Sequence, residues 1–121
     1  MRASAARFFL TRRAALDLRA IDARSRRQWG DQVADRYVAD LYAAMREAAA
    51  NPQAGRLRER RSAPFLMTAA RQHFVIYDLM PQGIAVLTIQ HGVRDIETLI
   101  AGLTPSFRAE VQRLKRQIPA G

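Results

Sequence analysis

Two histidines are the side chains of this 121-residue chain that titrate nearest to neutral pH. His73 and His91 lie in two segments that are each typical of a β-strand, so they could meet across a sheet. Two histidines without a third ligand make a poor zinc site, and a structural role is the simpler interpretation. Acid–base chemistry on RNA would need a histidine or tyrosine beside arginines that stabilise the charge developing at phosphorus. His91 with Arg71 and Arg94 could supply this combination.

Other chemical motifs are missing from the sequence. It has no cysteine, which excludes disulfides, thiolate metal sites and cysteine nucleophiles. It also lacks a phosphate-binding glycine loop and a nucleophile elbow, and we expect neither a metal nor another cofactor. An arginine-rich segment could contact phosphate but has no aromatic residue to stack bases, so a solvated loop is expected. Its arginines are Arg56, Arg58, Arg60 and Arg61.

The charge balance is strongly basic. Twenty Lys and Arg against eleven Asp and Glu leave a net charge of +9, and Lys115 is the only lysine. Such a surface attracts an acidic protein, a nucleic acid or an acidic machine that handles nucleic acid. Residues 1–10 carry two arginines and lack the longer apolar region of a signal peptide, so we expect a cytoplasmic protein without a signal peptide or membrane span.

The N-terminal third predicts a strand followed by a helix. Residues 7–10 are a short apolar run, and Thr11 is placed to cap a helix over 12–28. Gly30 can adopt the backbone conformation that ends this helix, and Trp29 beside it is expected to pack and close a helical hairpin. Four arginines are expected to face away from the apolar stripe: Arg19, Arg24, Arg26 and Arg27.

A second helix is predicted over residues 31–50. Asp31 is placed to cap it, and Asn51-Pro52 ends it. Its apolar stripe has Tyr37 and Tyr42 at its edges and consists of Ala34, Val38, Leu41, Met45 and Ala48. Two helices with so short a connection fold back on each other and need a third surface to cover their apolar faces.

Three further runs predict strands that supply this surface. Residues 64–70, 72–79 and 84–90 are rich in β-branched or aromatic residues, and residues 80–83 (MPQG) predict a hairpin turn. The expected fold is α+β, with the order β-α-α-β-β-β and a helical hairpin packed on a small antiparallel sheet.

The C-terminal segment predicts an additional helix. Thr104-Pro105 is typical of a helix start, and apolar residues recur behind it at helical spacing among basic ones. We therefore expect a domain over residues 1–103 and a basic amphipathic helical extension over 104–121. This helix either docks on the domain or is offered to a partner.

Five segments resemble the ParE-type toxins of the RelE/ParE superfamily. In that family a strand ending in Ser or Thr precedes a helix with small residues and Asp-Leu-x-x-Ile, and the last strand leads into a His-x-x-Arg-Asp turn. The resemblance covers about residues 7–100, and its order and spacing are more specific than any single motif. The matching segments are residues 9–21, 29–41, 51–56, 73–77 and 84–95.

The resemblance implies the toxin of a type II toxin–antitoxin pair. The partner would be a small acidic antitoxin whose disordered tail folds along the toxin, giving a hetero-oligomer. The ParE branch is taken to poison DNA gyrase by binding, without being a hydrolase. The RelE branch instead cleaves mRNA on the ribosome, so an endoribonuclease is the alternative. A third possibility is a degenerate toxin that serves only as a co-repressor of its antitoxin.

Departures from the family pattern favour the gyrase branch. Leu66 and Met67 stand where arginine is frequent, and Arg71 stands where a glycine often precedes the next strand. Lysines used by RNA-cleaving members are absent, and no tyrosine follows Tyr77. We therefore expect a binding protein rather than an enzyme.

The resemblance also implies site residues. His91, Arg94 and Asp95 match the terminal motif and are expected to face the target, although they could merely fix the end of the last strand. Were the protein a nuclease, His91, Arg94 and Arg71 would be its catalytic candidates. The residues expected to contact the antitoxin are Leu18, Trp29, Arg56 and Arg71.

Overall fold

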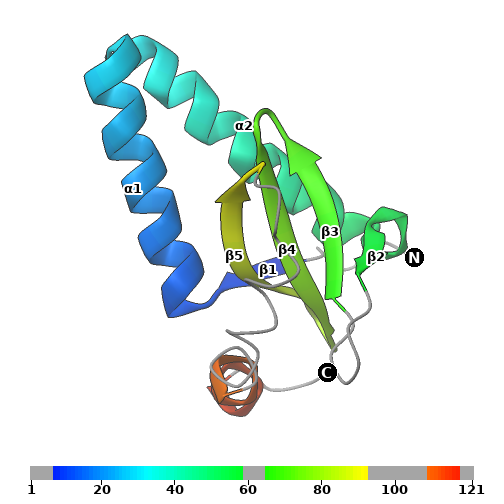
Figure 1. Ribbon diagram of the computed structural model, residues 1–121. Helices are drawn as coiled ribbons and strands as arrows, with labels where there is room; N and C mark the ends of the chain where they lie inside the picture. Colours follow the sequence, from blue (N-terminus) through cyan, green and yellow to red (C-terminus); the bar gives the residue numbers. More distant parts are fainter. Residues whose placement is uncertain (1–6, 59–64, 93–108, 118–121) are drawn as a thin grey trace.

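The computed structural model describes residues 7–58, 65–92 and 109–117, and these form an α+β fold (Figure 1). The strands form one sheet in the order β1-β5-β4-β3-β2, in which β1 runs parallel to β5 and all other neighbours are antiparallel. The elements in chain order are β1 (Arg7–Leu10), α1 (Arg12–Trp29), α2 (Asp31–Ala50), the 3-10 helix η1 (Pro52–Ala54), β2 (Arg56–Arg58), β3 (Phe65–Ala70), β4 (His73–Met80) and β5 (Gly83–His91). A further helix covers 109–117.

The helical hairpin forms as the sequence predicts, except at its connection. The Thr11 hydroxyl accepts a hydrogen bond from the Ala14 amide at 3.1 Å, which caps α1. Gly30 alone separates the two helices and has a φ of 89°, which suits glycine. The prediction that Asp31 caps α2 is wrong: Asp31 is the first helical residue, and its carboxylate bonds Arg26 at 3.2 Å instead.

The main core lies between this hairpin and one face of the sheet. Leu41 and Met45 of α2 are fully buried there against Val75 and Tyr77 of β4 and Ile84 of β5. The expected stripe on α2 is confirmed at its core positions, although Tyr37 is buried within it rather than lying at its edge. The buried residues of α2 are Ala34, Tyr37, Leu41, Met45, Ala48 and Ala49.

A β-bulge in β5 adapts the sheet to the helices. The β4–β5 register pairs Ile76 with Thr88 but Tyr77 with Val86, so Leu87 is the extra residue. Because the bulge shifts the alternation by one, Val86 and Ile89 both belong to the core on the helical side, while Leu87 packs on the opposite face.

Two expectations about the strands need correction. The segment expected to be an arginine-rich loop contains η1 and β2, because residues 56–58 pair with β3 at the sheet edge. The sheet is also not wholly antiparallel, since β1 lies parallel beside β5. The other strands begin and end within a residue of their predicted limits.

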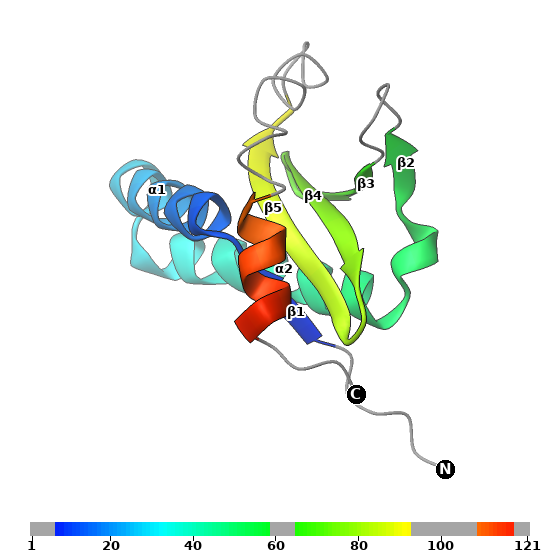
Figure 2. The same ribbon diagram turned by 90° about the horizontal axis from the view of Figure 1, so that it is seen from below.

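Helix 109–117 covers the second face of the sheet (Figure 2). Val111 and Leu114 are buried there with Ile76, Met80 and Leu87. Of the two possibilities for this helix, docking on the domain is therefore the one observed for its described residues. The domain boundary at residue 103 lies outside the described residues and stays a prediction. No described helix is long and apolar enough to cross a bilayer.

Glu110 connects this helix to the start of α1. Its carboxylate accepts a hydrogen bond from the Arg12 amide at 3.2 Å and from the Arg113 guanidinium at 2.9 Å. The Arg12 amide is one of the free donors at a helix N-terminus, where the helix dipole favours a negative charge. The hydrogen bond from Arg113 is the main cause that holds the pKa of Glu110 below its usual value, with a further contribution from the Arg12 amide.

We expect Glu110→Gln to lower the free energy of unfolding by about 1 kcal/mol at pH 7. A carboxyl whose pKa is depressed in the folded state stabilises the protein above its unfolded-state pKa, and this contribution is lost as pH falls through the folded pKa. The difference between the variant and the wild type, measured by urea unfolding, should therefore disappear in acid. Glu47→Gln on the exposed side of α2 is the control, and a pH-independent difference at Glu110 would contradict this role.

Candidate functional site

A cleft of about 440 Å³ opens between α1 and the end of the sheet. It lies where β1 pairs with β5 only as far as Val86, beyond which no described strand pairs with β5 on that side. The cleft is lined from α1, α2, the β3–β4 turn and β5. Its lining residues are Arg13, Asp17, Ala20, Ile21, Arg24, Ser25, Gln28, Trp29, Tyr37, Gln72, His73, Ile89, Gln90 and His91.

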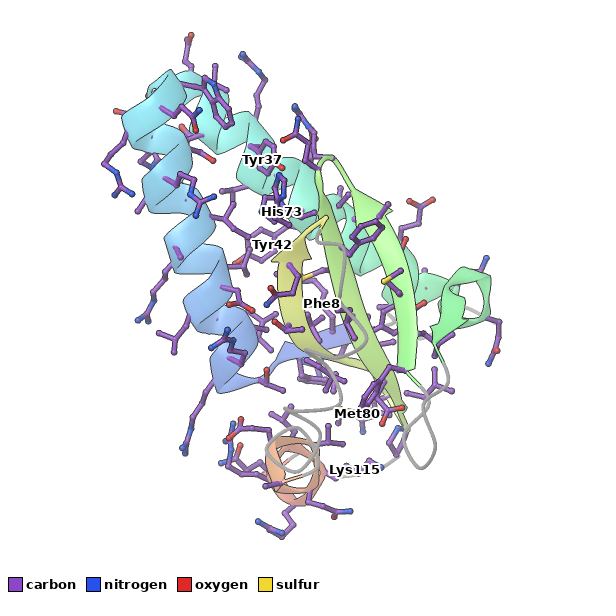
Figure 3. All side chains as sticks on the ribbon, viewed as in Figure 1. Phe8, Tyr37, Tyr42, His73, Met80 and Lys115 are labelled. Carbon is purple, nitrogen blue, oxygen red and sulfur yellow. The ribbon has the colours of Figure 1, made fainter. Side chains whose placement is uncertain are left out.

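The two histidines meet in this cleft, as the sequence predicts. His73 and His91 are register partners on β4 and β5, and their ring centroids are 5.3 Å apart in an edge-to-face arrangement. The hydroxyl of Tyr37 lies 2.6 Å from Nδ1 of His73, and Figure 3 shows these two side chains pointing toward each other. The structure thus adds a phenol to the pair of imidazoles.

The environment of His73 keeps its imidazole neutral near pH 7. Burial is the main cause that lowers the pKa of His73, and electrostatic interactions with His91 and with Arg24 lower it further, against an opposing effect of Asp17. A neutral imidazole accepts at one nitrogen and donates at the other. Nδ1 of His73 can therefore accept the Tyr37 hydroxyl, which leaves the Nε2 hydrogen as a donor.

Asp17 is a site residue that the analysis of single motifs missed. Its carboxylate accepts hydrogen bonds from the Thr88 hydroxyl and, at 3.0 Å, from the Ile89 amide, and Nε of Arg13 lies 3.4 Å away. These bonds satisfy the open edge of β5 where β1 no longer pairs. Asp17 is the aspartate of the Asp-Leu-x-x-Ile pattern in the family resemblance. Its bonds to β5 hold α1 against that strand, which gives this aspartate a structural reason.

Trp29 does not close the hairpin as a buried packing residue. Its side chain is 48% exposed, and its ring lies nearly parallel to that of Tyr37 with 6.3 Å between centroids. Arg24, which was expected to face away from the apolar stripe, lines the cleft. Arg26 pairs with three aspartates, Asp22, Asp31 and Asp35, and so ties the two helices together.

Arg71 occupies a strained turn position. It has a φ of 57° in the β3–β4 turn, the left-handed region that favours glycine, which explains why a glycine suits this place. Its guanidinium donates to Asp40 at 2.7 Å and lies 5.1 Å from the ring centroid of Tyr37. These contacts offset the cost of the backbone conformation.

Arg71→Ala and Arg71→Gly separate these two effects. The alanine variant loses both contacts and keeps the strained backbone, so we expect it to lose about 1–2 kcal/mol of stability. The glycine variant loses the same contacts but relieves the backbone, and should be about 1 kcal/mol more stable than the alanine variant. Urea unfolding of both checks this, and equal stabilities would refute the strain.

The remaining predicted site residues that the structure describes do not form one site. Arg94 and Asp95 lie outside the described residues. Of the three residues expected to face the target, only His91 is therefore described, and it is exposed at the end of β5. Leu18 is only 7% exposed and packs in the core. The backbone of Arg56 belongs to β2. Arg71 contacts Tyr37 but does not line the cleft.

Metal ligation finds no support among the described residues. No group of three histidine, aspartate or glutamate side chains in residues 7–58, 65–92 and 109–117 converges to hold an ion. The described lining of the cleft presents two imidazoles, a phenol, an indole and the guanidinium of Arg24.

Comparisons with known proteins identify the family. Among solved structures, the fold is similar to a chain described as the chromosomal ParDE TA system from P. aeruginosa, with a TM-score of 0.61 and 19% sequence identity over 72% of this chain and 96% of that chain. The sequence has no significant match among curated proteins. Residues 8–96 match the family model described as the ParE toxin of the type II toxin–antitoxin system parDE. The chain therefore belongs to the ParE toxin family of type II toxin–antitoxin systems.

Proposed function

We propose that this ParE-family toxin acts in the cytoplasm by binding DNA gyrase and that a small acidic antitoxin neutralises it. The observation that carries the antitoxin half is the charge of α1. That helix contains six arginines and two aspartates. Both aspartates are already paired, Asp17 with Arg13 and Asp22 with Arg26.

The outer face of α1 offers the contacts that an acidic amphipathic segment needs. Arg19 and Arg27 are exposed and form no ion pair with a described carboxylate. Leu16 lies three residues before Arg19 on the same face and is 57% exposed. An exposed leucine near guanidinium groups that pair with no described carboxylate suits a partner that has apolar and acidic residues on one side.

The residues proposed to contact the antitoxin differ in part from those expected from the sequence. Leu18 is turned into the core, so Leu16 takes its place in the proposal, whereas Trp29 and Arg71 are exposed and remain part of it. Binding of the acidic chain along α1 would make a toxin–antitoxin hetero-oligomer.

The double variant Arg19→Glu/Arg27→Glu should slow association with the antitoxin about ten-fold or more at low ionic strength. Steering by opposite charges acts mainly on the association rate and is screened by salt. Stopped-flow association of the purified pair, at low salt and at about 0.5 M salt, measures both effects. Arg36→Glu/Arg46→Glu makes the same charge change on exposed positions of α2 and is the control. Equal rates for the two double variants would remove the α1 surface from the proposal.

Gyrase binding is supported by the family membership and by the position of His91, the first residue of the terminal motif. The strand that leads into residues 91–95 ends at the rim of the cleft, where His91 is exposed. A partner that contacts this motif would meet the end of β5 and the neighbouring cleft. We propose His91, with Arg94 and Asp95, as the target-facing edge.

The target is tested by two assays run side by side. Purified protein added to gyrase should block supercoiling of a relaxed plasmid and accumulate cleaved DNA, and it should leave mRNA intact on translating ribosomes. Complete supercoiling at a large molar excess of the protein would contradict the gyrase proposal. Codon-dependent mRNA cuts that disappear in His91→Ala would establish the endoribonuclease instead.

One observation keeps the endoribonuclease as a second candidate: the cleft brings His73, His91 and Tyr37 together. Their geometry does not favour it. The two imidazole rings contact each other at a centroid distance of 5.3 Å, so they cannot stand on opposite sides of a phosphorus atom as acid and base. The expected partner Arg71 is bound to Asp40 outside the cleft.

A further inference from the structure

The cleft carries amide side chains to which the proposed toxin function gives no role, although it does use Trp29 and His91 of the same lining. Three amide side chains line it together with the histidines, the indole and the phenol: Gln28, Gln72 and Gln90. Amides and imidazoles can both donate and accept hydrogen bonds, so they can match a ligand that presents both kinds of group along one edge.

The charge of the cleft favours an anion. Asp17 is the only carboxylate among its described lining residues, and its oxygens are occupied by Thr88, by the Ile89 amide and by Arg13. Arg24 lines the same cleft and makes no ion pair with a described carboxylate. Its planar guanidinium is suited to bind a phosphate through two parallel hydrogen bonds.

An aromatic platform lies at the mouth of the cleft. Trp29 is half exposed, and its ring is supported by the nearly parallel ring of Tyr37. Tyr37 is in turn held by His73, so the platform has a fixed orientation. Stacking of a base on such an aromatic side chain stabilises binding without depending on the base sequence.

The apolar part of the lining is small. It consists of Ala20, Ile21 and Ile89, of which Ile89 is buried in the floor. An amphipathic helix binds through a continuous apolar stripe of several residues, which this cleft does not provide. Its volume of about 440 Å³ lies within the range of small-ligand sites.

We propose that this cleft binds a nucleoside monophosphate unit, with the phosphate held by Arg24 and the two histidines and the base stacked on Trp29. The ligand can be a free nucleotide or one unit of a single strand, because both present the same chemistry. This site goes beyond the binding of antitoxin and gyrase and does not depend on either.

Trp29 is the only tryptophan of the chain, so its fluorescence reports on the cleft directly. The probes are adenosine 5′-monophosphate, adenosine, inorganic phosphate, a short single-stranded oligonucleotide of thymidylate and a pentaglutamate peptide. Each is titrated into the full-length protein. The variants are Arg24→Gln in the cleft and Arg19→Gln, the same change at an exposed position of α1 outside it. Circular dichroism verifies that both variants are folded.

Adenosine monophosphate should change the fluorescence saturably, and adenosine or phosphate alone should bind about ten-fold more weakly because each lacks half of the contacts. Arg24→Gln should weaken binding about ten-fold, and Arg19→Gln less than about two-fold. Tighter binding of the oligonucleotide would identify a single strand as the source, and tighter binding of the mononucleotide would identify a free nucleotide.

Three results would overturn the proposal. The first is the lack of a saturable change with either the mononucleotide or the oligonucleotide. The second is an equal loss of affinity in Arg24→Gln and Arg19→Gln, which would show unspecific attraction to the basic surface. The third is tighter binding of pentaglutamate than of both nucleotides, which would assign the cleft to an acidic peptide.

Discussion

Replacing Asp17 by alanine is expected to lower the free energy of unfolding by about 3 kcal/mol. The substitution leaves the Ile89 amide and the Thr88 hydroxyl without their acceptor at a place where β1 no longer pairs with β5 and no other described strand replaces it. Each buried polar group that loses its partner costs about 1–3 kcal/mol. Arg13 would also lose its partner, and α1 would no longer be held against β5.

The matched control for this prediction lies on the same helix. Asp22→Ala removes a carboxylate that bonds only the partly exposed Arg26, and it should cost less than about 1 kcal/mol. Urea unfolding followed by circular dichroism compares the two variants. Similar losses at both positions would show that the bonds of Asp17 to β5 contribute no more than an ion pair near the surface.

Gly83→Ala is the second substitution with a large expected effect, and we expect it to cost at least about 3 kcal/mol. A Cβ atom at Gly83 would lie 1.7 Å from the carbonyl oxygen of Arg7, its partner in the parallel β1–β5 pair. The obstacle is backbone, so no side-chain rotation relieves it. The strand β1 would have to move, and with it Phe8, which packs against Tyr42.

Gly30→Ala separates the close contact from the backbone conformation. Gly83 and Gly30 both have a positive φ, which for Gly30 is 89°. Nothing, however, lies within 4 Å of a hypothetical Cβ atom at Gly30. The alanine there should cost only the conformational strain, about 1–2 kcal/mol. Thermal unfolding of both variants is the measurement. An effect at Gly83 no larger than that at Gly30 would contradict the role given to the β1–β5 contact.

Local chemistry explains why much of the fold could be predicted from the sequence. Thr11 and Gly30 act at the ends of α1 through their own side chain and backbone, and the 3.6-residue spacing of Leu41, Met45 and Ala48 reports directly on a buried helix face. The cross-strand meeting of His73 and His91 could likewise be expected, because the short turn at residues 81–82 fixes the register of β4 and β5.

The wrong or missed predictions concern features that depend on contacts between residues far apart in the sequence. The pairing of residues 56–58 with β3 depends on a partner strand that local composition does not reveal, and Asp31 bonds Arg26 on another helix. Asp17 and Tyr37 were missed as site residues because their partners, Ile89 and His73, are far away in sequence. The sequence did carry one indication for Asp17: it lies three residues after Ala14 and four before Ile21, on the apolar face of α1.

We propose a toxin that works by binding and whose antitoxin recognises the arginines of α1. His91, which we propose to face the target, lines the cleft at the end of β5, whereas Arg19 and Arg27 are not among the lining residues. Charge reversal on α1 should therefore spare toxicity while it weakens neutralisation.

Growth of bacteria that express the toxin tests this most directly, with and without co-expression of the acidic antitoxin expected from the open reading frame immediately upstream. The account predicts that the wild-type protein alone stops growth and that the antitoxin restores it. It further predicts that Arg19→Glu/Arg27→Glu still stops growth and is only partly neutralised at the same level of antitoxin. Normal growth with the wild-type protein alone, or full rescue of the double variant, would contradict the account.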